Sequence, residues 1–206
     1  MIKSIFAGAA SAAVILGAAY AQDDAPFEPA PAPIGDKGSF YFGVGLGFGE
    51  VTADGASQAG FPDGSLDYDG GFAGSLLAGY NLSDFFAVEA EVTGRTNDFE
   101  GNIGDADFTV STLMAGAVVK APLPGGFEPY AGAALGLVST NLEDADNAFG
   151  YQLKGGLRKS FRGRHAIGAE ASFVFTDGYE ARGTTGDVEL EYEHAAYMLT
   201  YRFTSR

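Results

Sequence analysis

Eight segments of this chain have the length of β-strands, and most of them alternate apolar or aromatic side chains with polar or small ones; this pattern limits the fold more than any other feature. The first segment, Phe40 to Phe48, places phenylalanine, valine and leucine on one face, and tyrosine and glycine on the other. A repeat of two residues is that of a β-strand, whose successive side chains point to opposite faces. The other seven segments are residues 72–80, 86–95, 108–120, 128–138, 149–158, 167–176 and 194–203.

The connections between these segments alternate between long and short. The long ones are residues 50–70, 96–106, 139–148 and 177–187, and the short ones are 81–84, 122–126 and 162–164. All short connections therefore fall at one end of an antiparallel sheet. Segments of about ten residues with this arrangement are typical of a barrel that spans a bilayer with every backbone group paired. We predict an all-β fold: a closed antiparallel transmembrane β-barrel of eight strands, with long extracellular loops and short periplasmic turns.

One part of this barrel is left open by the pattern. The segment 128–138 is small and apolar on both faces, so alternation does not assign its orientation, nor firmly that of the segment before it. The chain contains no cysteine, so only hydrogen bonding and packing would hold the barrel together.

The N-terminal residues have the features of an export signal. Lys3 precedes an apolar run from Ile5 to Ala19, and Ala19-Tyr20-Ala21 has the small-x-small form of a cleavage site. A membrane anchor is the alternative, but the run is short and broken by glycine for a helix that needs about 20 apolar residues. We predict a signal peptide over residues 1–21, a Pro/Ala-rich periplasmic linker over 22–37, and the barrel over 38–206. The expected location is the cell outer membrane.

Charged and polar side chains lie on the faces opposite the aromatic ones. An eight-stranded barrel is only wide enough for side chains to fill it, so charges that point inward must pair. The spacing places Glu170 opposite Gly156 and diagonal to both Lys154 and Arg158, within reach of their long side chains. The segment 86–95 lies across the barrel from the segment 167–176, so Glu89 and Glu91 could meet the same cations over the lumen. Such a lumen is either a structural plug or a polar path, with or without a gate, for small solutes. The predicted lumen network consists of Glu89, Glu91, Arg95, Gln152, Lys154, Arg158, Glu170 and Arg202.

The net charge of -15 excludes nucleic acid as a partner, because phosphate contacts require clustered Lys and Arg. Acidic residues gather in the long connections, and basic ones in the last short connection. The acidic loops are either a solvated surface or a site where divalent cations bridge to anionic lipopolysaccharide. The Asp63-x-Ser65-x-Asp67-x-Asp69 spacing resembles a calcium loop, but Tyr68 stands where an EF-hand requires glycine. The acidic loop residues are Glu50, Asp54, Asp63, Asp67, Asp69, Asp98, Glu100, Asp105, Glu143, Asp144, Asp146, Asp177, Glu180 and Asp187.

Two rival functions are weaker on the residues present. A barrel enzyme that acts on lipid A or on surface peptides needs a nucleophile or a histidine with an acid partner. His194 has alanine, not serine, two residues on, and His165 follows a basic turn. A ligand-carrying soluble barrel would be apolar inside and polar outside, the reverse of this pattern. We expect no enzymatic activity, no metal and no cofactor.

Several short motifs, in order along the chain, resemble those of the porin-family, OmpA-like small outer-membrane barrels. They are Tyr41-Phe-Gly-Val-Gly-Leu-Gly, Ala78-Gly-Tyr80, Val88-Glu-Ala-Glu, Pro129-Tyr-Ala-Gly-Ala-Ala-Leu-Gly and Tyr201-Arg-Phe203. The resemblance covers residues 40–203. It implies a non-enzymatic barrel that serves envelope integrity, surface interaction or limited passage of small solutes, among outer-membrane lipid and lipopolysaccharide.

The resemblance also implies a role for the last strand. In that family the final strand carries the signal that the β-barrel assembly machinery recognises, and the chain commonly stops at the terminal aromatic. Here the matching residues are Tyr197, Leu199, Tyr201 and Phe203, and the chain continues through Arg206. We expect Phe203 to end the closing strand.

Overall fold

Strands make up nearly all of the part of the chain that can be described. The computed structural model describes residues 37–54, 65–67, 71–101, 104–140, 147–161, 163–176, 179–183 and 186–205. The long strands are β1 (Phe40–Asp54), β3 (Gly71–Asn81), β4 (Phe86–Gly101), β5 (Gly104–Lys120), β6 (Phe127–Thr140), β7 (Ala148–Phe161), β8 (His165–Thr176) and β10 (Gly186–Thr204). Two short strands, β2 (Ser65–Asp67) and β9 (Tyr179–Gly183), lie between them in the chain.

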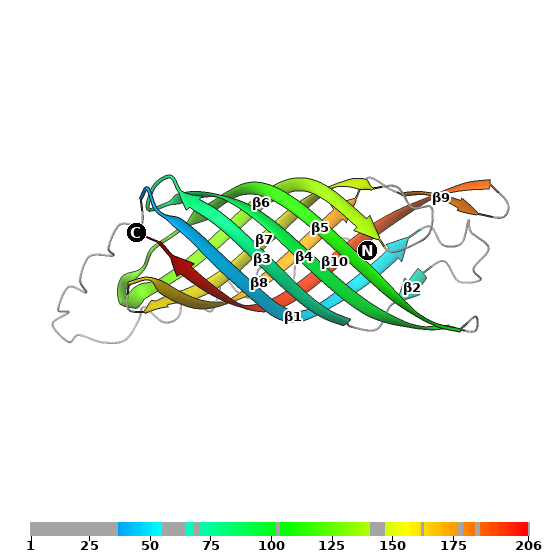
Figure 1. The fold of residues 1–206 in the computed structure, drawn as a ribbon, viewed down its shortest axis with the longest axis horizontal. Helices are drawn as coiled ribbons and strands as arrows, with labels where there is room; N and C mark the ends of the chain where they lie inside the picture. Colours follow the sequence, from blue (N-terminus) through cyan, green and yellow to red (C-terminus); the bar gives the residue numbers. More distant parts are fainter. Residues whose placement is uncertain are drawn as a thin grey trace, which may run out of the picture. The chain divides into compact units, whose positions relative to one another are not determined.

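The eight long strands close into one antiparallel barrel. Each pairs with the next along the chain, in the order β1-β3-β4-β5-β6-β7-β8-β10. The last strand then pairs with the first, from Tyr41 opposite Thr204 to Asp54 opposite Glu191. Figure 1 shows these strands running obliquely around the barrel, with β2 and β9 at the end opposite the C-terminus. The predicted closed barrel of eight strands is confirmed.

The two faces of the barrel wall differ as the alternation predicts. On β1 the side chains of Phe40 and Phe42 are 59% and 57% exposed, whereas Tyr41 between them is fully buried. Bulky apolar side chains cover the outside of every long strand from β1 to β8 and of β10. A monomer in water rarely exposes so continuous an apolar surface, so this wall faces lipid. The same polarity argues against the ligand-carrying soluble barrel.

The orientation that the sequence left open is resolved by burial. On β6, Glu128 and Tyr130 are buried in the lumen while Leu135 is 57% exposed on the outer wall. On β5, Met114 and Lys120 point inward and are buried. Even-numbered residues of both strands therefore face the lumen.

All four regions predicted as long loops are partly strand, and those boundaries are corrected. β1 continues to Asp54 and pairs there with β2, within the segment predicted as the loop 50–70. β6 ends at Thr140 and β7 begins at Ala148, so both extend into the predicted loop 139–148. β4 and β5 remain paired as far as Gly101 and Gly104, within the segment predicted as the loop 96–106. β9 pairs with the first part of β10, within the predicted loop 177–187. Alternation marks a strand only where its two faces meet different surroundings, so the mostly polar residues 96–106 gave no such signal.

The short connections form tight turns. Between β3 and β4 the amides of Leu82 and Ser83 both donate to the carbonyl of Phe86. Between β5 and β6, a single 3-10 turn at Pro124–Gly126 relies on positive φ at Gly125, which costs glycine little. Among the described residues, no helix is long and apolar enough to cross a membrane. The predicted signal peptide, and the linker up to residue 36, lie outside the described residues and stay predictions.

Candidate functional site

The lumen contains an ion cluster that joins opposite sides of the barrel. Glu89 and Glu91 point inward from β4, and Lys154 points inward from β7, three strands away around the wall. The Lys154 Nζ lies 2.5 Å from Glu89 Oε2 and 2.8 Å from Glu91 Oε2. All three side chains are at most 5% exposed. Buried charges are tolerated only when paired, so one ammonium serves two carboxylates across the lumen.

Hydroxyl groups complete the hydrogen bonding of these two carboxylates. Tyr41 Oη donates to Glu89 Oε1 at 2.6 Å, and Thr93 Oγ1 donates to Glu91 Oε1 at 3.2 Å. Each carboxylate thus has one oxygen on Lys154 and the other on a hydroxyl. Charge-assisted hydrogen bonds of this kind are stronger than neutral ones.

A second cluster lies toward the short-turn end and centres on Glu128 of β6. Arg158 Nε lies 2.6 Å from Glu128 Oε1, and Arg202 Nη2 lies 3.5 Å from the same oxygen. The two guanidinium groups also stack on tyrosine rings, Arg158 at 4.4 Å from the centroid of Tyr130 and Arg202 at 4.7 Å from that of Tyr41. Cation–π stacking holds these groups in place where they cannot reach water. Tyr41 therefore contacts both clusters.

Two glycines leave the space for the two lumen tyrosines. The ring of Tyr41 lies against Gly79 of β3, and a β-carbon there would overlap the ring. A β-carbon at Gly156 of β7 would lie 2.7 Å from Tyr130 Oη. The lumen face therefore alternates very small and large residues across neighbouring strands.

Glu170 pairs differently from the prediction. It lies opposite Gly156, as the spacing places it. Its Oε2, however, accepts a hydrogen bond from Tyr130 Oη at 2.7 Å, while Lys154 and Arg158 contact other carboxylates. The expected diagonal pairs are replaced because β4 and β6 supply carboxylates that reach the same cations from across the lumen.

The short-turn end of the lumen is closed by a third set of polar side chains. Lys120 Nζ donates to Asn81 Oδ1 at 2.5 Å, and Asn81 Nδ2 donates to Ser39 Oγ at 3.0 Å. All three are buried. They link β5, β3 and the residue preceding β1 beneath the ion clusters.

The loop-side half of the lumen is different in character. Arg95 is 1% exposed, and its Nη2 lies 3.4 Å from Ser172 Oγ. Gln152 and His194 are also buried there, and both stand opposite Val174 of β8 in the strand register. The eight predicted lumen residues thus fall into two groups: Arg95 and Gln152 lie in this half, and the other six lie in or beside the ion clusters.

Sequence reasoning missed several members of the site. Tyr41 could have been found, because it is the one large side chain on a face of glycines. Tyr130 and Glu128 could not, since the orientation of their strand was unassigned. Lys120 and Asn81 stand at strand ends, where alternation carries little information.

The four C-terminal aromatic and aliphatic residues lie on the outer wall. Tyr197, Leu199 and Tyr201 are 52%, 71% and 39% exposed. Phe203 is half-buried and pairs with Phe42 in the closing register. One expectation is wrong: Phe203 does not end the strand, because β10 includes Thr204, and the amide of Ser205 donates to the carbonyl of Phe40.

The side chains of most of the acidic loop residues lie outside what can be described, although several of these residues belong to strands that extend into the predicted loops. Glu50 alone among them has a described side chain, which is exposed. The contact with divalent cations and lipopolysaccharide therefore stays a prediction.

A barrel with an apolar wall, a charged lumen, and short turns at one end defines the class of small outer-membrane β-barrels. The model of the outer membrane protein beta-barrel domain matches residues 9–203, and the chain belongs to this family. The chain thus resides in the cell outer membrane.

Two solved structures show the same fold. Neisserial surface protein A is 18% identical with a TM-score of 0.60, and the match covers 80% of this chain and 96% of that one. The outer membrane protein OprG from Pseudomonas aeruginosa is 15% identical with a TM-score of 0.51, covering 82% and 98%. The comparison with curated proteins gives no match.

Proposed function

We propose that this protein is a non-enzymatic envelope barrel whose lumen is closed, and that it contributes to outer-membrane integrity rather than to solute passage. The observation that carries this proposal is the bridge of Lys154 to Glu89 and Glu91, which crosses the lumen between β4 and β7. A solute of any size would have to displace this buried, fully paired cluster.

Packing beside the bridge supports a closed lumen. A cavity of about 10 Å³ lies next to Lys154, between Gln152, Met114 and the glutamates of β4. That volume is about what a single water molecule requires. Below it, the Glu128 cluster and the Lys120 contacts with Asn81 fill the lumen toward the periplasm.

Limited passage of small solutes is the second candidate. Arg95 Nε and Nη1, and both amide atoms of Gln152, are buried without a hydrogen-bond partner in the loop-side half. Buried polar groups of this kind normally bind water. This half could therefore hydrate, although the ion clusters still lie between it and the periplasm.

Conductance separates the two candidates. Residues 22–206, refolded and inserted into a planar bilayer, should show no stable openings under applied voltage. A porin inserted in the same membrane serves as the control for detection. Discrete, long-lived openings of the wild-type barrel would overturn the closed-lumen proposal and favour the passage of solutes.

A further inference from the structure

The hairpin between β7 and β8 is basic in an otherwise acidic protein. From Arg158 to Ala169 the sequence has four Lys or Arg residues, one histidine and no Asp or Glu, although the whole chain carries a net charge of -15. Arg158 points into the lumen, where it pairs with Glu128. Lys159 and Arg164 are instead exposed on the outside, at the short-turn end of the barrel.

Aromatic rings lie beside Lys159 and beside His165, the neighbour of Arg164, and form an aromatic frame at this end of the wall. Lys159 Nζ lies 4.8 Å from the ring centroid of Phe127. The imidazole of His165 stacks on Phe161 at 5.7 Å, and its Nδ1 lies 2.6 Å from Tyr201 Oη. Aromatic side chains favour the boundary between hydrocarbon and headgroups, so this frame marks the periplasmic interface of the membrane. The cations therefore stand at the depth of lipid phosphates.

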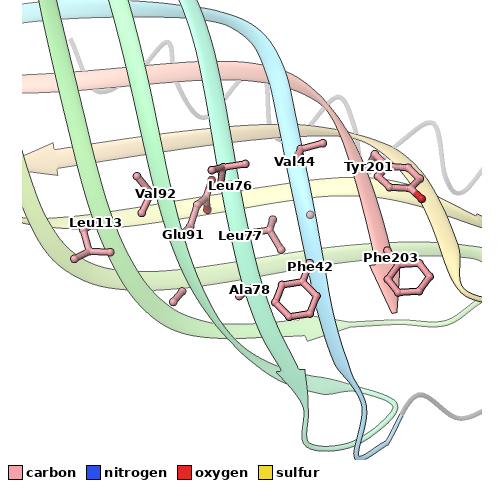
Figure 2. Close-up of a pocket in the computed structure, with 12 residues that line it drawn as sticks. Phe42, Val44, Leu76, Leu77, Ala78, Glu91, Val92, Leu113, Tyr201 and Phe203 are labelled. Atoms are coloured by element: carbon pink, nitrogen blue, oxygen red, sulfur yellow. The ribbon is translucent and has the colours of Figure 1, made fainter. Parts of the chain in front are cut away.

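An apolar hollow of about 550 Å³ lies on the outer wall next to this frame. Figure 2 shows it between Phe42 and Phe203 on one side and Leu113 on the other, with Ala78 in its lower part. The strand register explains the hollow. Ala78 of β3 stands opposite Ala90 of β4, so two small lipid-facing residues lie side by side.

Bulky residues surround this pair of alanines. Two residues further along each strand toward the loops, four apolar side chains stand opposite one another on neighbouring strands: Val44, Leu76, Val92 and Leu113. One step toward the turns, Phe40 packs on Tyr80 with ring centroids 4.8 Å apart. The hollow is open on its outer side, so an acyl chain can enter it from the surrounding lipid.

The frame and the hollow adjoin each other. Phe203 pairs with His165 on one side and with Phe42 on the other, and Phe42 pairs with Ala78. Tyr201, whose hydroxyl meets His165, also lines the hollow. In addition, the amide of Thr204 donates to the carbonyl of Arg164 at 2.8 Å, which ties the basic turn to the end of β10.

We propose that this part of the wall binds one anionic phospholipid of the periplasmic leaflet, with its phosphate near Arg164, Lys159 and His165 and an acyl chain in the hollow at Ala78 and Ala90. The wall faces hydrocarbon, so its occupant is a lipid. The cations select a negative headgroup. The short-turn end lies in the leaflet made of phospholipid, which excludes lipopolysaccharide as the occupant.

Native mass spectrometry of the full barrel tests this proposal. The protein is released from nanodiscs that contain equal amounts of phosphatidylglycerol and phosphatidylcholine, and the lipid that stays bound is identified. The wild-type barrel should retain phosphatidylglycerol in preference. Each of Arg164→Gln and Lys159→Gln should lower that preference about fivefold, the ratio expected for one cation near a membrane surface. Lys37→Gln, at an exposed cation outside the hairpin, should leave it unchanged.

A second pair of variants tests the hollow. Ala90→Leu should reduce the amount of both lipids retained, because the larger side chain fills the part of the hollow where the acyl chain would lie. Ala131 is also an exposed alanine, but it lies on β6 and outside the hollow, so Ala131→Leu should leave the amount of both lipids unchanged. Equal retention of the two lipids by the wild-type barrel would overturn the proposal, and so would equal losses in Ala90→Leu and Ala131→Leu. All substituted positions are solvent- or lipid-exposed, so each variant is expected to fold, and heat-dependent migration on a gel checks this.

Discussion

Gly79 lies directly beneath the phenol ring of Tyr41, in register on the neighbouring strand, and the ring occupies the space where a β-carbon would be. The same tyrosine hydrogen-bonds to Glu89 and stacks under Arg202. Because Gly79 has no side chain, the side chain of Tyr41 has room to reach both ion clusters.

The first prediction follows from this contact. Gly79→Ala should destabilise the barrel by about 1–3 kcal/mol, because a methyl group in a filled lumen forces Tyr41 off its position. Gly94→Ala is the matched control: it also lies in a long strand, but nothing would lie within 4 Å of its β-carbon. Urea unfolding in detergent micelles measures both, and equal midpoints for the two variants would show that the lumen yields to the added methyl.

The second prediction concerns the bridge across the lumen. Lys154→Met should cost about 3–5 kcal/mol, because Glu89 and Glu91 would remain buried without a cation. Lys159→Met, an exposed lysine on the same strand, should change stability by no more than about 0.5 kcal/mol. Adding Glu89→Gln and Glu91→Gln to Lys154→Met should recover most of the loss. Failure to recover stability would indicate that the lysine acts through packing instead of charge.

The lumen residues show which features the sequence predicts and which it does not. Alternation placed Phe42 against lipid and Glu89 in the lumen. One face of the wall contacts hydrocarbon and the other contacts polar side chains, so a period of two in the sequence shows which residues lie on which face. The pattern also allowed Glu89 and Glu91 to meet Lys154 or Arg158 over the lumen, and Lys154 does contact both glutamates. It could not say which carboxylate meets which cation, because contacts across a lumen depend on strand tilt and stagger, which the sequence does not display. The register of Glu170 with Gly156 could be predicted from one tight turn, whereas its partner Tyr130 lay on a strand of unassigned orientation.

The third prediction tests that unexpected partner. Tyr130→Phe should destabilise the barrel by about 1.5–3 kcal/mol, since it removes a hydrogen bond to a buried carboxylate. The phenylalanine keeps the ring on which Arg158 stacks, so the loss reports the hydroxyl alone. Tyr197→Phe, on the lipid-facing wall, should have little effect. In the background of Glu170→Gln the cost of Tyr130→Phe should shrink, and an undiminished cost would assign the effect to some other contact of the hydroxyl.

The last prediction concerns assembly. Phe203 stands at the seam where β10 meets β1, opposite Phe42, and its ring centroid is 5.4 Å from that of His165 on β8. It therefore joins three strands near the point where the barrel closes. Phe203→Ala should lower the amount of folded barrel recovered from outer membranes, measured by heat-dependent migration on a gel. Phe149→Ala, which removes a more exposed aromatic ring at the loop end of β7, away from the seam, should not lower recovery. Thr204 of β10 is buried and pairs with Tyr41 of β1, and the amide of Ser205 donates to the carbonyl of Phe40. Removal of residues 204–206 should therefore also reduce recovery. Recovery of both changed proteins at the wild-type level would mean that closure does not depend on this end of the seam.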